Sequence, residues 1–232
     1  MIKVSSLNFS YNRKSGKILK NINLKIEDGE SIAIVGHNGA GKTTLVKLII
    51  GFLNSKSGEV KISSDIIKQR QDIYYLPNEN DLFKNMTLYQ NLKFKKLLFN
   101  YKKVDIVQNE LVDEFHFRKN LNKKISEMSS GMAKISSLIC GLLFQPKLII
   151  LDEPTNSIDF HSKNMLESFL LKFKDGKNTI INVSHDLDYV YNVSDRFVII
   201  DNGEIVHDVP KRNFQNIEDF KKEYLEWTKT NE

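Results

Sequence analysis

The chain has 232 residues, of which 41% are hydrophobic and 27% charged, and its 34 Lys and Arg exceed its 29 Asp and Glu to give a net charge of +5. This length fits one large domain and argues against two domains in tandem, because single cores stop growing near ~250 residues. The composition excludes a collagen, a low-complexity chain and global disorder. The basic residues form no stripe with aromatic residues that matches a nucleic-acid module, so we expect no nucleic-acid partner.

Two features of the sequence concern its compartment. Cys140 is the only cysteine and cannot form an internal disulfide, and the first residues lack the pattern of a signal peptide. The longest apolar runs, such as Leu138–Phe144, are far shorter than the roughly 20 residues that cross a bilayer. We therefore expect a chain in the reducing cytoplasm that does not span a membrane by itself.

The chain opens with a pattern typical of β-strands. Apolar residues alternate with polar ones in Ile2–Phe9, with a slip near Ser5-Ser6, and again in Ile22–Ile26. These segments predict two or three half-buried, antiparallel strands. Ser31–Val35 is almost wholly apolar and predicts a central strand covered on both faces, followed by a Gly-rich turn and a helix over Thr43–Phe52.

The middle and end of the chain predict an α/β sheet. Residues 86–144 have apolar residues at helical spacing, which indicates an inserted helical lobe. Buried-strand patterns return at Leu148–Leu151, Thr179–Val183 and Phe197–Ile200.

The last segments predict a hairpin and a helix. Asn202-Gly203 is a strong hairpin signal, and the apolar residues of 214–227 have helical spacing that predicts packing on the core. We expect a single domain over 1–232. Its expected parts are a core with a β subdomain over about 1–85 and 146–210, a helical lobe over about 86–145 and a helical tail over about 211–232.

One loop between a predicted strand and helix fills the pattern G-x-x-x-x-G-K-[ST]. It comprises Gly36, His37, Asn38, Gly39, Ala40, Gly41, Lys42 and Thr43. The backbone N–H groups of such a loop close around a phosphate, and the following helix N-terminus adds partial positive charge. The pattern therefore predicts a nucleotide phosphate site, in which Lys42 reaches the β- and γ-phosphates and Thr43 offers its hydroxyl to Mg²⁺.

Two acids end a second buried strand. Asp152 and Glu153 follow Leu148–Leu151, and ligands of open α/β folds bind at the carboxyl ends of the strands. We expect Asp152 to hold Mg²⁺ and Glu153 to accept a hydrogen bond from the attacking water. An acidic pair alone is weak support for this role, and its combination with the phosphate loop makes the interpretation strong.

Over roughly residues 2–210 these motifs resemble the nucleotide-binding subunit of an ATP-binding cassette (ABC) transporter. The resemblance implies a P-loop NTPase core sheet with an N-terminal antiparallel β subdomain and an inserted helical lobe, and it implies ATP and Mg²⁺ as the bound groups. Further segments match the family's motifs in the family's order. They are Tyr11 for stacking on adenine, Thr44 after the phosphate loop, Asn78 at the glutamine position near metal and water, Ser129, Ser130 and Gly131 in the signature, Asp159 in the loop that joins two half-sites, and His185 as the γ-phosphate sensor.

Two of these segments depart from the family's pattern. Asn78 is one methylene shorter than the usual glutamine, which predicts slow hydrolysis or hydrolysis that needs the partner. The signature Met128–Met132 keeps Ser129 and Gly131 but differs at three of five positions from the usual Leu-Ser-Gly-Gly-Gln. This variant resembles small exporter cassettes that handle drugs and bacteriocin-type peptides.

The resemblance also implies partners. Two cassettes should enclose two Mg·ATP, as a homodimer or a heterodimer, and drive a separately encoded integral membrane permease, so the chain should lie peripherally on the inner face of the cell membrane. Two alternatives remain: an ABC ATPase without a transport role, and a regulatory or immunity subunit with weak ATPase activity.

The segment after Asn78 and the start of the predicted helical lobe carry more apolar residues than one helix face needs. Phe83 and Phe94 are two of them. In the family that the chain resembles, this region forms a groove for a short cytoplasmic helix of the permease, so we interpret both residues as part of such an apolar surface; an amphipathic helix in a groove is a recurrent mode of recognition. The alternative is that both rings fill the core of the lobe itself.

Overall fold

The structure is a computed structural model that describes residues 1–12, 16–63, 72–101, 105–106, 110–175 and 178–229. Its centre is a six-stranded sheet in which the first five strands are parallel and the last is antiparallel to its neighbour. In spatial order the strands are β5 (Ile73–Leu76), β6 (Leu148–Asp152), β7 (Thr179–Val183), β3 (Ser31–Val35), β8 (Arg196–Asp201) and β9 (Glu204–Pro210).

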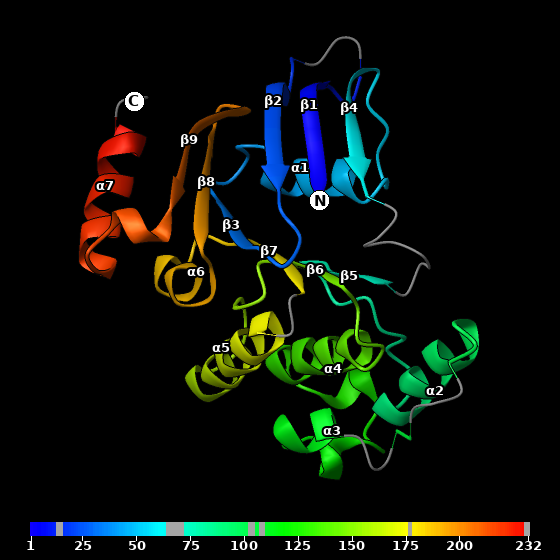
Figure 1. Cartoon of the computed structure of the whole chain (residues 1–232). Helices are drawn as coiled ribbons and strands as arrows, with labels where there is room; N and C mark the ends of the chain where they lie inside the picture. Colours follow the sequence, from blue (N-terminus) through cyan, green and yellow to red (C-terminus); the bar gives the residue numbers. More distant parts are fainter. Residues whose placement is uncertain (13–15, 64–71, 102–104, 107–109, 176–177, 230–232) are drawn as a thin grey trace.

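A smaller antiparallel sheet lies beside it, in the order β2 (Leu19–Ile26), β1 (Ile2–Phe9) and β4 (Ser57–Ile62) (Figure 1). Its apolar side chains share one buried cluster with α1 (Lys42–Ile49) and with one face of the central sheet. The predicted slip near Ser5-Ser6 is confirmed, because Ser6 has a φ of 46° and the pairing of β1 with β2 shifts register between Val4 and Leu7.

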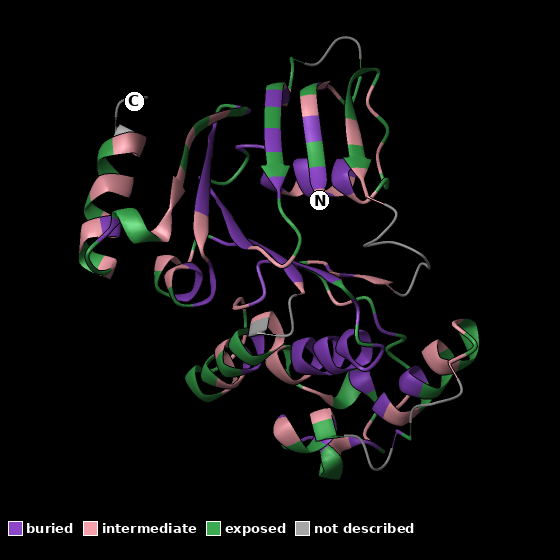
Figure 2. Cartoon of the chain, in the orientation of Figure 1, coloured by how far each residue is buried: buried purple, intermediate pink, exposed green. Residues whose placement is uncertain are grey.

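Helices cover the other face of the central sheet. They are α4 (Ser130–Leu142), α5 (Phe160–Asp175), α6 (Leu187–Val193) and α7 (Ile217–Lys229). The alternation within β3 shows both layers, since Ile32 and Ile34 join the cluster of the small sheet while Ala33 and Val35 join that of the helices. Figure 2 shows the resulting concentration of buried residues in β3, β6, β7 and α4. The predicted α/β fold is confirmed.

The predicted helical lobe contains α2 (Leu88–Leu98), the short α3 (Glu110–Glu114) and α4. Helix α2 begins with a capping box, in which the Thr87 hydroxyl accepts from the Gln90 N–H and the Gln90 side chain accepts from the Thr87 N–H. The expected extension of α1 to Phe52 is wrong: the helix ends at Ile49, because Gly51 takes a left-handed φ of 76° that stops it.

Two predictions for the last third of the chain are confirmed. Asn202 and Gly203 have φ values of 46° and 79° and join β8 to β9, as a two-residue hairpin turn requires. In the tail, Phe220 of α7 is fully buried and its ring stacks on Phe197 at a centroid distance of 4.1 Å. Among the described residues, no helix has the length and apolar character that a membrane crossing demands.

Candidate nucleotide site

The phosphate loop connects β3 to α1. His37, Asn38 and Gly39 are exposed at its tip, and Gly36, Ala40 and Gly41 are buried at its ends. Lys42 is the first residue of α1, and its Nζ donates to the carbonyls of Gly36 at 2.7 Å and His37 at 3.0 Å. Burial lowers the pKa of Lys42. The ammonium is thus held inside the curve of the loop, where the loop's own carbonyls are its acceptors.

Thr43 and Asp152 meet although they lie 109 positions apart in the sequence. The Thr43 hydroxyl lies 2.8 Å from Oδ2 and 3.1 Å from Oδ1 of Asp152, at the end of β6. Burial raises the pKa of Asp152, and hydrogen bonds from Thr43 and Tyr75 oppose that rise. A hydroxyl and a carboxylate are hard oxygen donors of the kind that Mg²⁺ prefers, so these two residues fit a magnesium ion.

Glu153 and His185 share a hydrogen bond at the ends of neighbouring strands. His185 Nδ1 lies 2.9 Å from Glu153 Oε2, and the Ser184 hydroxyl donates to the same oxygen at 3.2 Å. The Glu153 N–H donates to the Val183 carbonyl at 2.7 Å, and the residue has a left-handed φ of 51°. Because a left-handed φ is uncommon for a residue other than glycine, the neighbours hold Glu153 in one orientation.

The signature residues form the exposed beginning of α4. The Ser129 hydroxyl accepts from the Met132 N–H at 3.2 Å and caps the helix, and Ser130 is exposed beside it. Gly131 packs closely against the loop between β6 and α5. A Cβ added to Gly131 would lie 2.6 Å from the Ser157 carbonyl oxygen. That loop ends at Asp159, whose carboxylate accepts from the Ser162 N–H at 2.8 Å, and this bond keeps the pKa of Asp159 low.

The predicted residues thus fall into two groups. One group lies at the carboxyl ends of β3, β6 and β7, and we call it the sheet-edge site. Within the described residues it comprises Lys42, Thr43, Asp152, Glu153 and His185. No hydrogen bond or ion pair in that part of the chain joins them to the signature at the start of α4.

Asn78 follows β5 and lies outside both groups. Its Oδ1 accepts from Asn156 Nδ2 at 3.4 Å, and its side chain is exposed. The backbone is held by Lys134 of α4, whose Nζ donates to the carbonyls of Asn78 at 2.9 Å and Pro77 at 3.0 Å. Burial lowers the pKa of Lys134 to about 8.

Tyr11 lies beside the start of α1, where the residue is 59% exposed. Its hydroxyl is 3.2 Å from Oγ1 of Thr44, and its ring packs edge-on against Phe9 at 5.1 Å. An exposed, anchored aromatic ring near a phosphate loop is a suitable surface for a base to stack on.

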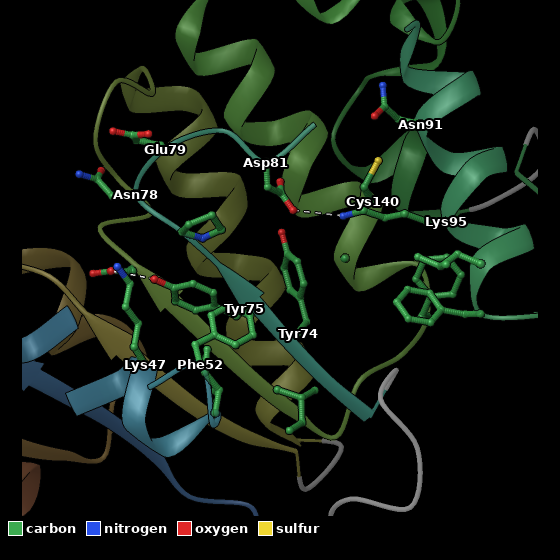
Figure 3. Close-up of a pocket in the computed structure, with 18 of the residues that line it drawn as sticks. Lys47, Phe52, Tyr74, Tyr75, Asn78, Glu79, Asp81, Asn91, Lys95 and Cys140 are labelled. Atoms are coloured by element: carbon green, nitrogen blue, oxygen red, sulfur yellow. Dashed lines mark hydrogen bonds and ion pairs between the residues drawn. The ribbon is translucent and has the colours of Figure 1, made fainter. Parts of the chain in front are cut away.

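A groove of about 1420 Å³ opens next to the sheet-edge site, between β5, the end of α1 and α2 (Figure 3). We call it the apolar groove. Phe83 and Phe94 line it, are 51% and 40% exposed, and contact each other edge-to-face at 5.1 Å. The interpretation of both rings as surface residues is therefore confirmed, and the alternative that they fill the core of the lobe is wrong. Leu88 and Leu92 fill that core instead.

Four contributors to the site were missed by the sequence reasoning: Tyr75, Lys134, Asn156 and Ser184. Lys134 could have been found, because it is the only charged residue within the apolar stretch of α4. Ser184 directly precedes His185 in the sequence. The sequence offers no comparable signal for Tyr75 and Asn156, which reach the site through strand pairing and a turn.

Comparisons with known proteins agree with this geometry. Residues 19–156, more than half of the chain, match the family described as ABC transporter. The chain is 33% identical over 220 residues to a putative ABC transporter ATP-binding protein of Bacillus cereus, covering 90% of this chain but only 38% of that protein. It is 29% identical over 210 residues to the ABC transporter ATP-binding protein NatA of Bacillus subtilis, covering 87% of this chain and 85% of NatA.

A relative named for import and a solved structure complete the comparison. The spermidine/putrescine import ATP-binding protein PotA of Borrelia garinii is 29% identical over 230 residues, covering 92% of this chain and 66% of PotA. The fold matches a solved ATP-binding subunit of an ABC transporter with a TM-score of 0.86 at 24% identity, over 98% of this chain and 99% of that one. The chain therefore belongs to the ABC transporter family, as an ATP-binding cassette with the fold of an ABC ATPase.

Proposed function

We propose that this chain is the ATP-hydrolysing subunit of an exporter, in which two cassettes dimerise around two Mg·ATP and drive a separate membrane permease from the inner face of the membrane. The observation that carries the proposal is the division of the motifs: the sheet-edge site is assembled, while the capped and exposed start of α4 that bears Ser129 and Ser130 stands apart from it. One copy then supplies only half of each site.

In this proposal the residues of one cassette bind and orient the nucleotide. The N–H groups of Gly36–Thr43 and the Lys42 ammonium hold the phosphates, and Tyr11 stacks on the base. Thr43 and Asp152 hold Mg²⁺, and the shorter Asn78 reaches the ion only indirectly. The ion, when bound, neutralises charge on the phosphate oxygens.

Glu153 and His185 act on the attacking water and the γ-phosphate. The Glu153 carboxylate orients the water and accepts its proton, and the hydrogen bonds from Ser184 and His185 fix the position of Oε2. His185 is 59% exposed on its side chain and can turn its other ring nitrogen toward the phosphate. The partner's signature would close the site, since a helix N-terminus favours a bound anion.

Mixing two inactive variants tests the division into half-sites. Lys42→Ala damages the phosphate loop, and Ser130→Glu places a negative charge on the exposed start of α4, where it suits the helix but repels phosphate. Each variant alone should lose most of its ATPase activity. A mixture should regain activity, because every mixed dimer contains one site with both lesions and one site with neither.

Absence of recovery in the mixture would contradict the dimer with shared sites. Ser126→Glu, at an exposed position in the 3-10 helix Ile125–Glu127 before the signature, is a control that should keep its ATPase activity both alone and in the mixture.

The permease and the direction of transport are further parts of the proposal. The apolar groove supports a permease partner, because Phe83 and Phe94 remain exposed without one. The signature variant Ser129-Ser130-Gly131-Met132 supports export, although PotA, a relative of similar identity, is named for import. Reconstitution with the permease in vesicles tests the direction: ATP added outside should load inside-out vesicles with an exported compound.

One observation favours the alternative of a regulatory or immunity subunit with weak ATPase activity. The Asn78 side chain is exposed and accepts from Asn156, and no described hydrogen bond joins it to Thr43 or Asp152. Turnover by the purified chain separates the two functions, and Asn78→Gln should raise the rate if the shorter side chain limits hydrolysis.

A further inference from the structure

Tyr75 lies between the apolar groove and the carboxylate that fits a magnesium ion. Its strand β5 pairs in parallel with β6, with Tyr75 opposite Ile150, which brings the side chain within reach of Asp152 two residues further on. The Tyr75 hydroxyl donates to Asp152 Oδ2 at 3.1 Å.

The ring of Tyr75 is held from the opposite side by Phe52. The two rings meet edge-to-face at a centroid distance of 5.9 Å, and both residues line the groove (Figure 3). Phe52 is 69% exposed in the segment that follows α1. The ring contact packs the Tyr75 side chain in the position from which its hydroxyl reaches Asp152.

Asp152 Oδ2 accepts from two hydroxyls, those of Thr43 and Tyr75. A hydroxyl has one proton and two lone pairs, so Thr43 can donate to Asp152 and still present a lone pair to a cation. Tyr75 has no such second task, and its bond fixes the rotation of the carboxylate. Partners that orient a metal-binding side chain in this way typically change metal affinity by about 10- to 100-fold when they are removed.

We infer that Tyr75 is a positioning residue for Asp152 and sets the affinity of the nucleotide site for its divalent cation. The inference rests on the proposed nucleotide site and assigns a role to a residue outside the motifs that predicted that site. It also means that Tyr75, which orients Asp152, lines the apolar groove that we assign to the permease.

The neighbouring tyrosine provides a matched control. Tyr74 precedes Tyr75 on β5 and points away from it, and its hydroxyl donates to the Ser137 carbonyl of α4 at 2.7 Å (Figure 3). Tyr74→Phe and Tyr75→Phe therefore each remove one hydrogen-bonded phenol oxygen from the same strand. Only Tyr75→Phe removes a donor from Asp152.

The test is ADP binding by titration calorimetry, first in EDTA and then over a series of Mg²⁺ concentrations, with no turnover involved. Tyr75→Phe should leave ADP affinity in EDTA unchanged and raise the half-saturating Mg²⁺ concentration about 10-fold. Tyr74→Phe should leave both quantities unchanged, whatever it does to the melting temperature. A wild-type Mg²⁺ dependence in Tyr75→Phe, or an equal shift in both variants, overturns the inference.

A double-mutant cycle separates positioning from a general loss of structure. With Asp152→Asn as the background, Tyr75→Phe should have no further effect on the Mg²⁺ dependence, because the oriented carboxylate is gone. Fully additive effects would overturn the inference even if Tyr75→Phe lowers stability. A wild-type chain that binds no ADP would refute the proposed function itself, whereas normal Mg²⁺-dependent binding with an inert Tyr75→Phe refutes only the role of Tyr75.

Discussion

The sheet-edge site and the apolar groove adjoin each other but are built in opposite ways. In the sheet-edge site, Asp152 and Glu153 are 1% and 9% exposed and are held by hydrogen bonds from other strands and from α1. In the groove, Phe52 and Phe83 are 69% and 51% exposed. Chemistry requires groups fixed within the chain before the substrate arrives, whereas a docking surface remains uncovered until a partner binds.

The sheet-edge site should respond to the loss of a single charge. Glu153→Gln keeps the size of the side chain but removes the negative charge, and we expect ATP hydrolysis to fall roughly 10²- to 10⁴-fold while ATP binding persists. Light scattering should then detect an accumulated ATP-bound dimer. Glu204→Gln, an exposed substitution on β9, is the control. Turnover at the wild-type rate in Glu153→Gln would remove Glu153 from its proposed role.

Lys42 should affect binding rather than the chemical step. Lys42→Ala removes the ammonium inside the phosphate loop, where each hydrogen bond to a charged group contributes about 1.5 to 3 kcal/mol. Calorimetry should show that ATP binding is lost. Lys47→Ala, on the next turn of α1, should bind ATP like the wild type, and an equal loss in both variants would point to damage of the helix.

Substitutions in the apolar groove should behave in the opposite way: they should have no effect on the isolated chain and should act only when the partner is present. Phe83→Asp should leave the isolated chain folded and active, because the ring is already half exposed. With the permease, the variant loses roughly 1.5 to 3 kcal/mol of apolar burial and places an unpaired carboxylate in the interface, so co-purification should fail.

Circular dichroism and a pull-down measure the two effects of Phe83→Asp separately. Leu225→Asp is matched in exposure, at 51%, but lies on α7. It should fold and still co-purify. An undiminished pull-down of Phe83→Asp would place the interface elsewhere.

Tyr11 should give the smallest effect, because it is exposed like the groove residues and its proposed role is only to stack on the base of the nucleotide. Tyr11→Ala should weaken ATP and GTP binding alike by about 1 to 3 kcal/mol, since stacking depends little on the identity of the base. Tyr11→Phe keeps the ring and loses only the contact with Thr44, so its affinity should stay near the wild type. Unchanged affinity in Tyr11→Ala would reduce Tyr11 to a structural residue.

The difference between the two regions also decides what the sequence could predict. Buried apolar strands precede four residues of the sheet-edge site: Lys42, Thr43, Asp152 and His185. Because the carboxyl ends of parallel strands lie at one edge of a sheet, local sequence patterns were enough to predict that these residues lie together. The exposure of Phe83 was predicted from an excess of apolar residues over one helix face.

Local sequence patterns could not predict contacts between residues far apart in the chain. Tyr75 meets Asp152 across 77 positions and Lys134 meets Pro77 across 57, and both contacts depend on how neighbouring elements align. The early end of α1 at Gly51 was missed for another reason: the apolar periodicity continues to Phe52, while the backbone of one glycine ends the helix.

The close packing of Gly131 against Ser157 limits how the chain can move. With only 2.6 Å between an added Cβ and the Ser157 carbonyl oxygen, the start of α4 and the loop that leads to Asp159 have no clearance between them. A displacement of the helix end toward the loop must therefore push the loop in the same direction. That loop continues from β6 and Glu153, so we expect pressure on the exposed start of α4 to reach, along a short path in the same molecule, the carboxylate to which we assign the catalytic role.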